Sequence, residues 1–224
     1  MRSRSVAAVL AIAVAILTGG AGSALAAPTA QPDERGAGAA AEIFATPNTA
    51  IITDPQDPRL KTRLVGFACQ VAGIVADNGG RVRGSALLDG VYWSPDLKQA
   101  TYERSRDFHV DGFSATRLHD VADLIRKQYH QEAVLTFEHL PQTSPRTNAF
   151  EVEVPGVDWQ RLYNGLVANP AARDRLGGGS VTQDHKLVLV AATADQPLVK
   201  QFVAALGGDW SASTVRYGAW DYVR

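Results

Sequence analysis

The pattern that most constrains the fold runs from residue 107 to the C-terminus, where helical and strand periodicities alternate. Leu118, Val121 and Ile125 recur at the spacing of one helix face, after Ser114, a residue type that commonly caps helices. Residues 150–154 alternate apolar and acidic side chains, which predicts a half-buried strand. Further strands are expected at 133–140, 187–192 and 213–223, and further helices beginning at Asp158 and Asp195. This order predicts an α+β fold of split β-α-β type, an antiparallel sheet with helices on one face.

Residues 61–110 predict a β-meander that precedes this sheet. Residues 64–76 are apolar and partly β-branched, and Asp77-Asn78-Gly79-Gly80 follows them. That sequence is typical of a hairpin turn, because Asn-Gly tolerates positive φ at both central positions. Strands are then expected at 81–88, 91–94 and 99–104. A buried helix over 64–76 is the alternative, since periodicity alone does not resolve a short apolar run.

The N-terminus predicts export from the cell. Arg2 and Arg4 precede the uncharged apolar residues 6–17, and the Ala-Leu-Ala sequence at 24–26 has the small residues that a signal peptidase recognises. The apolar stretch is shorter than the ~20 residues of a membrane-spanning helix. We therefore expect residues 1–26 to be a signal peptide, cleaved after Ala26 or nearby, and the mature protein to be extracellular without a membrane span.

The segment between the signal peptide and residue 61 is expected to be a tether. Residues 27–42 are rich in Ala, Gly and Pro without periodicity, and residues 43–60 contain three prolines. We predict that 27–60 is a disordered or extended linker and that 61–224 is one α+β domain. Cys69 is the only cysteine, so no intramolecular disulfide forms and the fold depends on its apolar core. Because Cys69 lies in an apolar run, we expect it to be buried.

Charge and motifs exclude several functional classes. Residues 61–224 carry 18 basic and 18 acidic side chains, so the basic surplus of a nucleic-acid-binding protein is absent. The chain has no phosphate-binding loop of the P-loop type, no HExxH motif and no nucleophile elbow. The Gly-Gly-Gly-Ser sequence at 177–180 is expected to be a loop, because the segment after it has strand character. We expect no cofactor, no metal and no nucleic-acid partner.

Acidic and histidine side chains on the predicted strands are the candidates for catalysis. Glu138 lies on the opposite side of its strand from His139, and Glu151 and Glu153 oppose the apolar side of the next strand. If these two strands pair, Glu138 shares a sheet face with Glu151 or Glu153. Clustered carboxylates raise one another's pKa for acid–base work, or bind Ca²⁺. The candidates are Glu138, Glu151, Glu153, His109 and His139, and a merely solvated sheet face is the alternative.

Three aromatic residues form a second candidate site. Tyr92, Trp93 and Tyr102 flank a turn at Pro95-Asp96, so we expect them to gather on one hairpin. Such side chains combine contact area with a polar tip, which suits ligand or protein recognition. Packing under a loop explains them equally well.

These features favour a secreted, non-catalytic protein that binds a small ligand or an extracellular protein partner. An extracellular hydrolase-type enzyme that uses a Glu/His acid–base pair is the main alternative. An envelope-associated structural protein is the third.

Overall fold

The computed structural model describes residues 39–224; the expected signal peptide and residues 27–38 of the expected tether lie outside the described residues. The strands are β1 (Ala41–Ala45), β2 (Arg81–Ser94), β3 (Gln99–Asp111), β4 (Val134–His139), β5 (Ala149–Pro155), β6 (Leu176–Thr182), β7 (Lys186–Ala192) and β8 (Thr214–Val223). The helices are α1 (Val65–Asp77), α2 (Ala115–Gln128), α3 (Trp159–Ala168), α4 (Pro170–Arg175) and α5 (Gln196–Ala205). None of these helices has the length and apolar character needed to cross a membrane.

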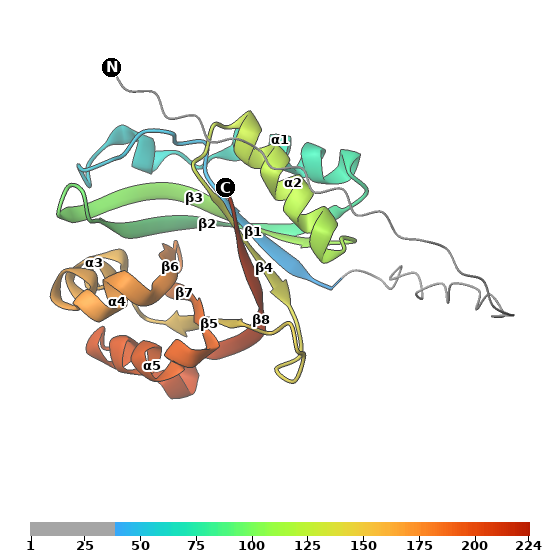
Figure 1. Cartoon of the computed structure of the whole chain (residues 1–224). Helices are drawn as coiled ribbons and strands as arrows, with labels where there is room; N and C mark the ends of the chain where they lie inside the picture. The colour runs from blue at the N-terminus through green and yellow to red at the C-terminus, as the bar shows by residue number, and fades with distance from the viewer. Residues whose placement is uncertain (1–38) are drawn as a thin grey trace, which may run out of the picture. The chain divides into compact units, whose positions relative to one another are not determined.

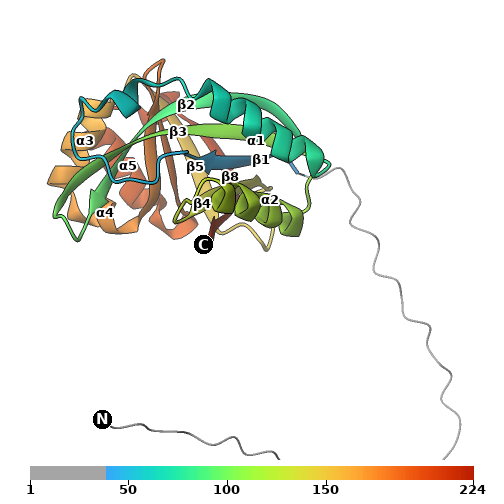
Figure 2. The same ribbon diagram turned by 90° about the horizontal axis from the view of Figure 1, so that it is seen from above.

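The strands close into one antiparallel barrel in the order β1-β3-β2-β6-β7-β5-β8-β4. The expected open sheet with helices on one face is therefore wrong, and so is the separate meander before it. β1 closes the barrel because it pairs with β3 on one side and with β4 on the other. β8 joins β4 to β5 in the same way. The helices lie outside the barrel, α1 and α2 in one group and α3, α4 and α5 in another (Figures 1 and 2).

The barrel consists of two halves with the same order of elements. The order strand, helix, strand, strand, helix, strand occurs from β1 to β4 and again from β5 to β8, where the short helix α4 is added. Within the barrel the halves run β4-β1-β3-β2 and β8-β5-β7-β6, and they join at β2–β6 and β4–β8. The helices of each half cover its outer face, so the inner face is free for other side chains.

The first part of the chain departs most from the expected elements. Residues 65–77 form α1 and not the expected strand, which confirms the alternative of a helix, and Phe67, Val71 and Val75 are buried at helical spacing. The expected hairpin turn after them is the end of this helix, where Gly79 has a φ of 85°. Cys69 is exposed on the other side of α1, contrary to expectation.

Residues 41–45 were expected to belong to a tether, but they form β1 at the closure of the barrel. The folded unit therefore begins earlier than residue 61. Ile43 is completely buried, which shows that this strand is part of the core. Residues 176–182, which include the expected Gly-rich loop, form β6. The helices expected after Ser114 and Asp158 are confirmed, and both side chains accept hydrogen bonds from backbone N–H groups of the first turn.

Strand alternation determines which side chains enter the barrel. On β3 the outward residues include Phe108, which packs in the cluster that contains α1 and α2. The inward residues of β3 are Glu103, Ser105, Asp107 and His109. The partners of three of them across β2 are small: Gly90 lies opposite Glu103, Ala86 opposite Asp107 and Gly84 opposite His109. A row of polar groups therefore faces open space inside the barrel.

Candidate functional site

Ionisable side chains from four strands meet at one end of the barrel. Glu42 comes from β1, Asp107 and His109 from β3, His139 from β4 and Glu151 from β5. The strand register brings them together. Glu42 pairs with His109 on one side, and on the other side it pairs with the residue two positions before His139.

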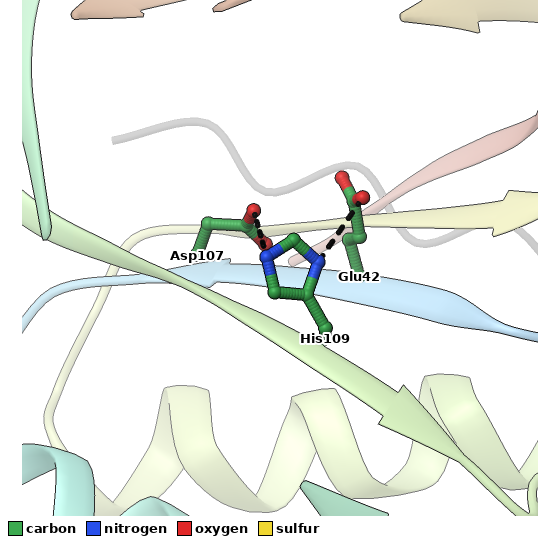
Figure 3. A group of neighbouring side chains, drawn as sticks. All are labelled: Glu42, Asp107 and His109. Atoms are coloured by element: carbon green, nitrogen blue, oxygen red, sulfur yellow. Dashed lines mark ion pairs between the residues drawn. The ribbon is translucent and has the colours of Figure 1, made fainter. Parts of the chain in front are cut away.

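Glu42 lies at the centre of this cluster. Its Oε1 atom is 3.1 Å from Nε2 of His139 and 3.4 Å from Nδ1 of His109. The other ring nitrogen of His109, Nε2, is 3.4 Å from Oδ2 of Asp107. Figure 3 shows the imidazole of His109 between the two carboxylates. One histidine thus connects two acidic groups, and one carboxylate contacts two histidines.

Three carboxylate oxygens of the cluster have no hydrogen-bond partner among residues 39–224. They are Oε2 of Glu42, Oδ1 of Asp107 and Oε2 of Glu151. The residues are 2%, 5% and 2% exposed, so water does not reach these atoms freely. Nη1 of Arg216 is 3.6 Å from Oε2 of Glu151, but the same atom also contacts Glu153. A buried carboxylate oxygen without a donor is costly, so the cluster is incomplete as a purely structural network.

The electrostatic environment shifts the pKa values of the carboxyl groups in different directions. Burial raises the pKa of Asp107 and of Glu151, and the nearby negative charge of Glu42 raises both further. Burial also acts to raise the pKa of Glu42, but hydrogen bonds with His109 and His139 outweigh it and lower the pKa to about 2. The hydrogen bond to Glu42 raises the pKa of His109 in turn. Glu42 is therefore the charged group around which the others are arranged.

A cavity of about 270 Å³ leads to the cluster from the barrel end. Asp107, His109 and Glu151 line it, together with Asp184 of the β6–β7 turn and Lys186 at the start of β7. The side chain of His109 is 44% exposed. A small ion can therefore reach the histidine from solvent without unfolding of the barrel.

The cluster contains two sets of potential metal ligands, and Glu42 belongs to both. One set is Glu42, Asp107 and His109, and the other is Glu42, His139 and Glu151; in each set the ligand atoms lie within 4.8 Å of one another. Mixed imidazole and carboxylate ligands are typical of transition-metal ions such as Zn²⁺, Fe²⁺ and Mn²⁺. The unpartnered oxygens are the atoms that such an ion would bind.

Four of the residues expected from the sequence come together here: His109, His139, Glu151 and Glu153. Glu138 does not, and the expectation that it shares their sheet face is wrong. β8 lies between β4 and β5, so the two strands do not pair. Glu138 points to the outside, where its oxygens accept hydrogen bonds of 2.6 and 2.8 Å from Arg146.

Glu42, Asp107 and Arg216 were missed by the sequence reasoning. Glu42 lies in the segment interpreted as a tether, although its apolar neighbours Ile43 and Phe44 were a signal of a short strand. Asp107 and His109 are two residues apart on one strand, a spacing that places both on one face. That spacing alone could have indicated that Asp107 and His109 belong to the same site.

The three aromatic candidates do not form one surface. Tyr92 and Tyr102 both line a depression at the other end of the barrel. Trp93 points elsewhere, with the guanidinium of Arg173 4.0 Å from its ring centroid. The ring of Tyr102 also stacks on Tyr163 of α3 at 6.0 Å, so much of this side chain serves packing. Tyr92 and Tyr102 thus line a depression, whereas Trp93 lies on the outer face of the barrel.

Comparisons with known proteins add little to this geometry. No family model matches the chain, and no curated protein matches it in sequence. A solved structure from Lactobacillus acidophilus NCFM, described as a "putative monooxygenase", is 10% identical over 83% of this chain and 96% of that chain, with a TM-score of 0.26. A likeness at this level supports no argument about activity.

Proposed function

We propose that this protein binds one divalent transition-metal ion at the end of its barrel. The ion is held by Glu42, which belongs to both sets of potential ligands, with His139 and Glu151 from one set and His109 from the other. The observation that carries the proposal is the presence of two buried carboxylate oxygens, Oε2 of Glu42 and Oε2 of Glu151, that accept no hydrogen bond from residues 39–224 and belong to a cluster with two imidazoles. A dication bound between Glu42 and Glu151 would give both oxygens a ligand contact.

The ligand types favour a transition-metal ion over Ca²⁺ or Mg²⁺. Ca²⁺ and Mg²⁺ prefer all-oxygen ligands, whereas imidazole suits zinc, iron, cobalt and nickel. His109 and His139 supply two nitrogens on either side of Glu42. We therefore expect Zn²⁺ and Co²⁺ to bind more tightly than Ca²⁺.

Asp107 supports the ion through His109. When Nδ1 of His109 faces the ion, Nε2 carries the proton and lies 3.4 Å from Oδ2 of Asp107. Metal-binding histidines commonly donate their second N–H to a carboxylate, which fixes the ring and its tautomer. Asp107 is thus a positioning residue and not a required ligand.

Calorimetric titration of metal-free protein tests the proposal. Zn²⁺ and Co²⁺ should each bind with a stoichiometry of about one per chain and with at least roughly tenfold higher affinity than Ca²⁺. Glu42→Gln should abolish this binding, because the central carboxylate contacts both histidines.

Glu138→Gln is the matched control. Glu138 is a carboxylate of the same barrel, but it lies on the outer side with Arg146. This variant should bind Zn²⁺ like the unaltered protein. Tighter binding of Ca²⁺, or Glu42→Gln protein that binds Zn²⁺ normally, would contradict the proposed site.

A hydrolase-type enzyme is a second candidate, favoured by the separation of pKa values within the same cluster. Glu42 has a pKa of about 2 and is ionised. Burial raises the pKa of Asp107 and of Glu151, so these two groups hold a proton to higher pH. Carboxyl groups separated in this way can serve as base and acid. A screen with chromogenic esters, phosphate esters and glycosides tests this candidate, and activity should disappear in Glu42→Gln but not in Glu138→Gln.

Export remains part of the proposal and depends on the sequence of residues 1–26. Mass spectrometry of protein recovered from the growth medium should find an N-terminus at or near Ala27. A cell-associated protein with residues 1–26 intact would contradict export.

A further inference from the structure

A second cavity lies inside the barrel, away from the carboxylate–histidine cluster. Its volume is about 150 Å³, and its walls include Phe44, Leu88, Leu135 and Val190. An outer depression of about 630 Å³ adjoins it, and Tyr92, Glu103 and Gln131 are among the residues that line both. We therefore expect a ligand to enter from this end of the barrel.

The inner cavity has few residues in common with the cavity that leads to the metal cluster. Leu88 and Val188 line both cavities. None of Glu42, His109, His139 and Glu151 lines the inner cavity, so we treat the two sites as separate.

Gln131 presents an unused hydrogen-bond donor to the inner cavity. The residue is 7% exposed, and its Oε1 atom accepts a hydrogen bond of 3.0 Å from the backbone N–H of Thr46. Its Nε2 atom is buried and has no hydrogen-bond partner in the part of the chain that the structure describes. The contact with Thr46 fixes the orientation of the amide, so the N–H₂ group is held in place for an acceptor.

Glu103 provides the complementary acceptor in the same wall. It lies on the inward face of β3 and lines the same cavity, and the ring of Tyr92 lies over the paired residue Gly90. Burial raises the pKa of Glu103 to about 7, so its carboxylate is substantially populated at neutral pH. A fixed donor and a nearby acceptor face the same apolar space.

The size of the inner cavity limits its occupant. A cavity of roughly 150 Å³ holds a ligand about the size of a single aromatic ring. Since apolar side chains form most of the wall, the occupant is expected to be a flat apolar ring. The donor and the acceptor require that it also carry a polar edge.

We propose that the inner cavity binds a single-ring carboxamide or cyclic amide, whose carbonyl accepts from Gln131 and whose N–H donates to Glu103. A neutral amide satisfies both groups, whereas a hydrocarbon leaves the buried Gln131 donor unpaired. A carboxylic acid, which is an anion at neutral pH, would meet the negative charge of Glu103. Selectivity for amides thus follows from the two polar groups and not from shape alone.

Calorimetric titration with benzamide, toluene and benzoate at pH 7.5 tests this proposal. Benzamide should bind at least roughly tenfold more tightly than either of the others, because the site's polar groups are left unpaired by analogues that lack the amide. Binding should be the same with and without a chelator, since the cavity is separate from the metal cluster. This result is independent of whether the metal proposal holds.

Two variants locate the ligand. Gln131→Glu keeps an acceptor for Thr46 but removes the amide donor, so benzamide affinity should fall by about tenfold. Gly178→Val fills the cavity, where a Cβ atom at this position would meet only Leu135, at 3.7 Å, and it should abolish binding. Gln142→Glu, the same change at an exposed position, should leave binding unchanged.

Each outcome decides for or against the proposal. Failure of benzamide to bind, or binding no tighter than that of toluene, overturns it. Normal benzamide binding by folded Gly178→Val protein also overturns it, because the ligand would then lie elsewhere. If Gln131→Glu does not fold, the Gly178→Val result and the comparison of the three compounds still decide.

Discussion

The Oε1 atom of Glu42 lies 3.1 Å from Nε2 of His139, although 97 positions separate the two residues in the chain. The contact exists because β1 pairs with β4 and places Glu42 against the end of that strand. The same pairing closes the barrel. The strand that completes the fold therefore also carries the central residue of the candidate metal site, so loss of β1 would remove both.

Asp107→Asn should weaken metal binding without abolishing it. The variant keeps the shape of the side chain but replaces the carboxyl group that faces Nε2 of His109 with an amide. Changes in such outer partners typically reduce metal affinity by about 10–100-fold. Calorimetry with Zn²⁺ measures the effect, and a loss as complete as that of Glu42→Gln would mean that Asp107 is itself a ligand.

Glu103 should make the stability of the protein decrease as the pH rises from about 5 to 8. Burial raises its pKa in the folded state from 4.5 to about 7, so between these values the folded state holds a proton that the unfolded state has lost. The stabilisation is complete below pH 4.5 and is lost as the pH rises through 7; it amounts to about 3 kcal/mol at most. Glu103→Gln removes this dependence.

Urea denaturation of the two proteins at pH 5 and pH 8 checks this prediction. Glu103→Gln protein should be more stable than the unaltered protein at pH 8 and similar to it at pH 5. Equal stability of the two proteins at both pH values would show that the Glu103 carboxyl is not shifted.

Local patterns in the sequence predicted individual elements better than their assembly. The helix after Ser114 was predicted because its cap and its apolar spacing are both local. For the segment 64–76 a strand was preferred and a buried helix was the alternative, and the helix is what forms. A nearly continuous apolar run has no clear period, and only its packing shows that Phe67, Val71 and Val75 form one face. Barrel closure depends on pairings between distant strands, which no local pattern records.

The same limit explains the partial prediction of the site. Glu151 and Glu153 were recognised because they alternate with apolar residues on one strand. Glu42 was missed because β1 is only 5 residues long and follows an Ala- and Gly-rich stretch. The expected unit of alternating elements began at 107, whereas the two actual halves divide between β4 and β5, so the expected strand neighbours were wrong.

Two glycine substitutions should have opposite effects on stability. A Cβ atom at Gly218 would collide with the backbone oxygen of Glu138, which is fixed by strand pairing, so Gly218→Ala should destabilise the barrel by about 1–3 kcal/mol or more. Gly73 is exposed in α1, and a methyl group added there would meet no atom within 4 Å, so Gly73→Ala should stabilise by about 0.5–1 kcal/mol. Thermal unfolding measures both, and a stabilising Gly218→Ala would contradict the β4–β8 register.

Cys69 should react with a thiol reagent in the folded protein. The side chain is exposed on α1, so no unfolding is needed for access. Mass spectrometry after brief alkylation should show one modification per chain at the same rate with and without low denaturant. A reaction that requires unfolding would support the burial expected from the sequence.

A chain that begins at residue 61 should fail to form the native barrel, whereas a chain that begins at residue 39 should form it. The shorter chain lacks β1, so β3 and β4 lose their shared partner and expose unpaired edges that favour aggregation. It also lacks Ile43 and Ile52, which are at most 1% exposed, and with them part of the core. Calorimetric unfolding should show one cooperative transition for residues 39–224 and a broad transition or aggregation for 61–224. Equally cooperative unfolding of both at the same temperature would restore the domain boundary near Lys61 and remove β1 from the structural core.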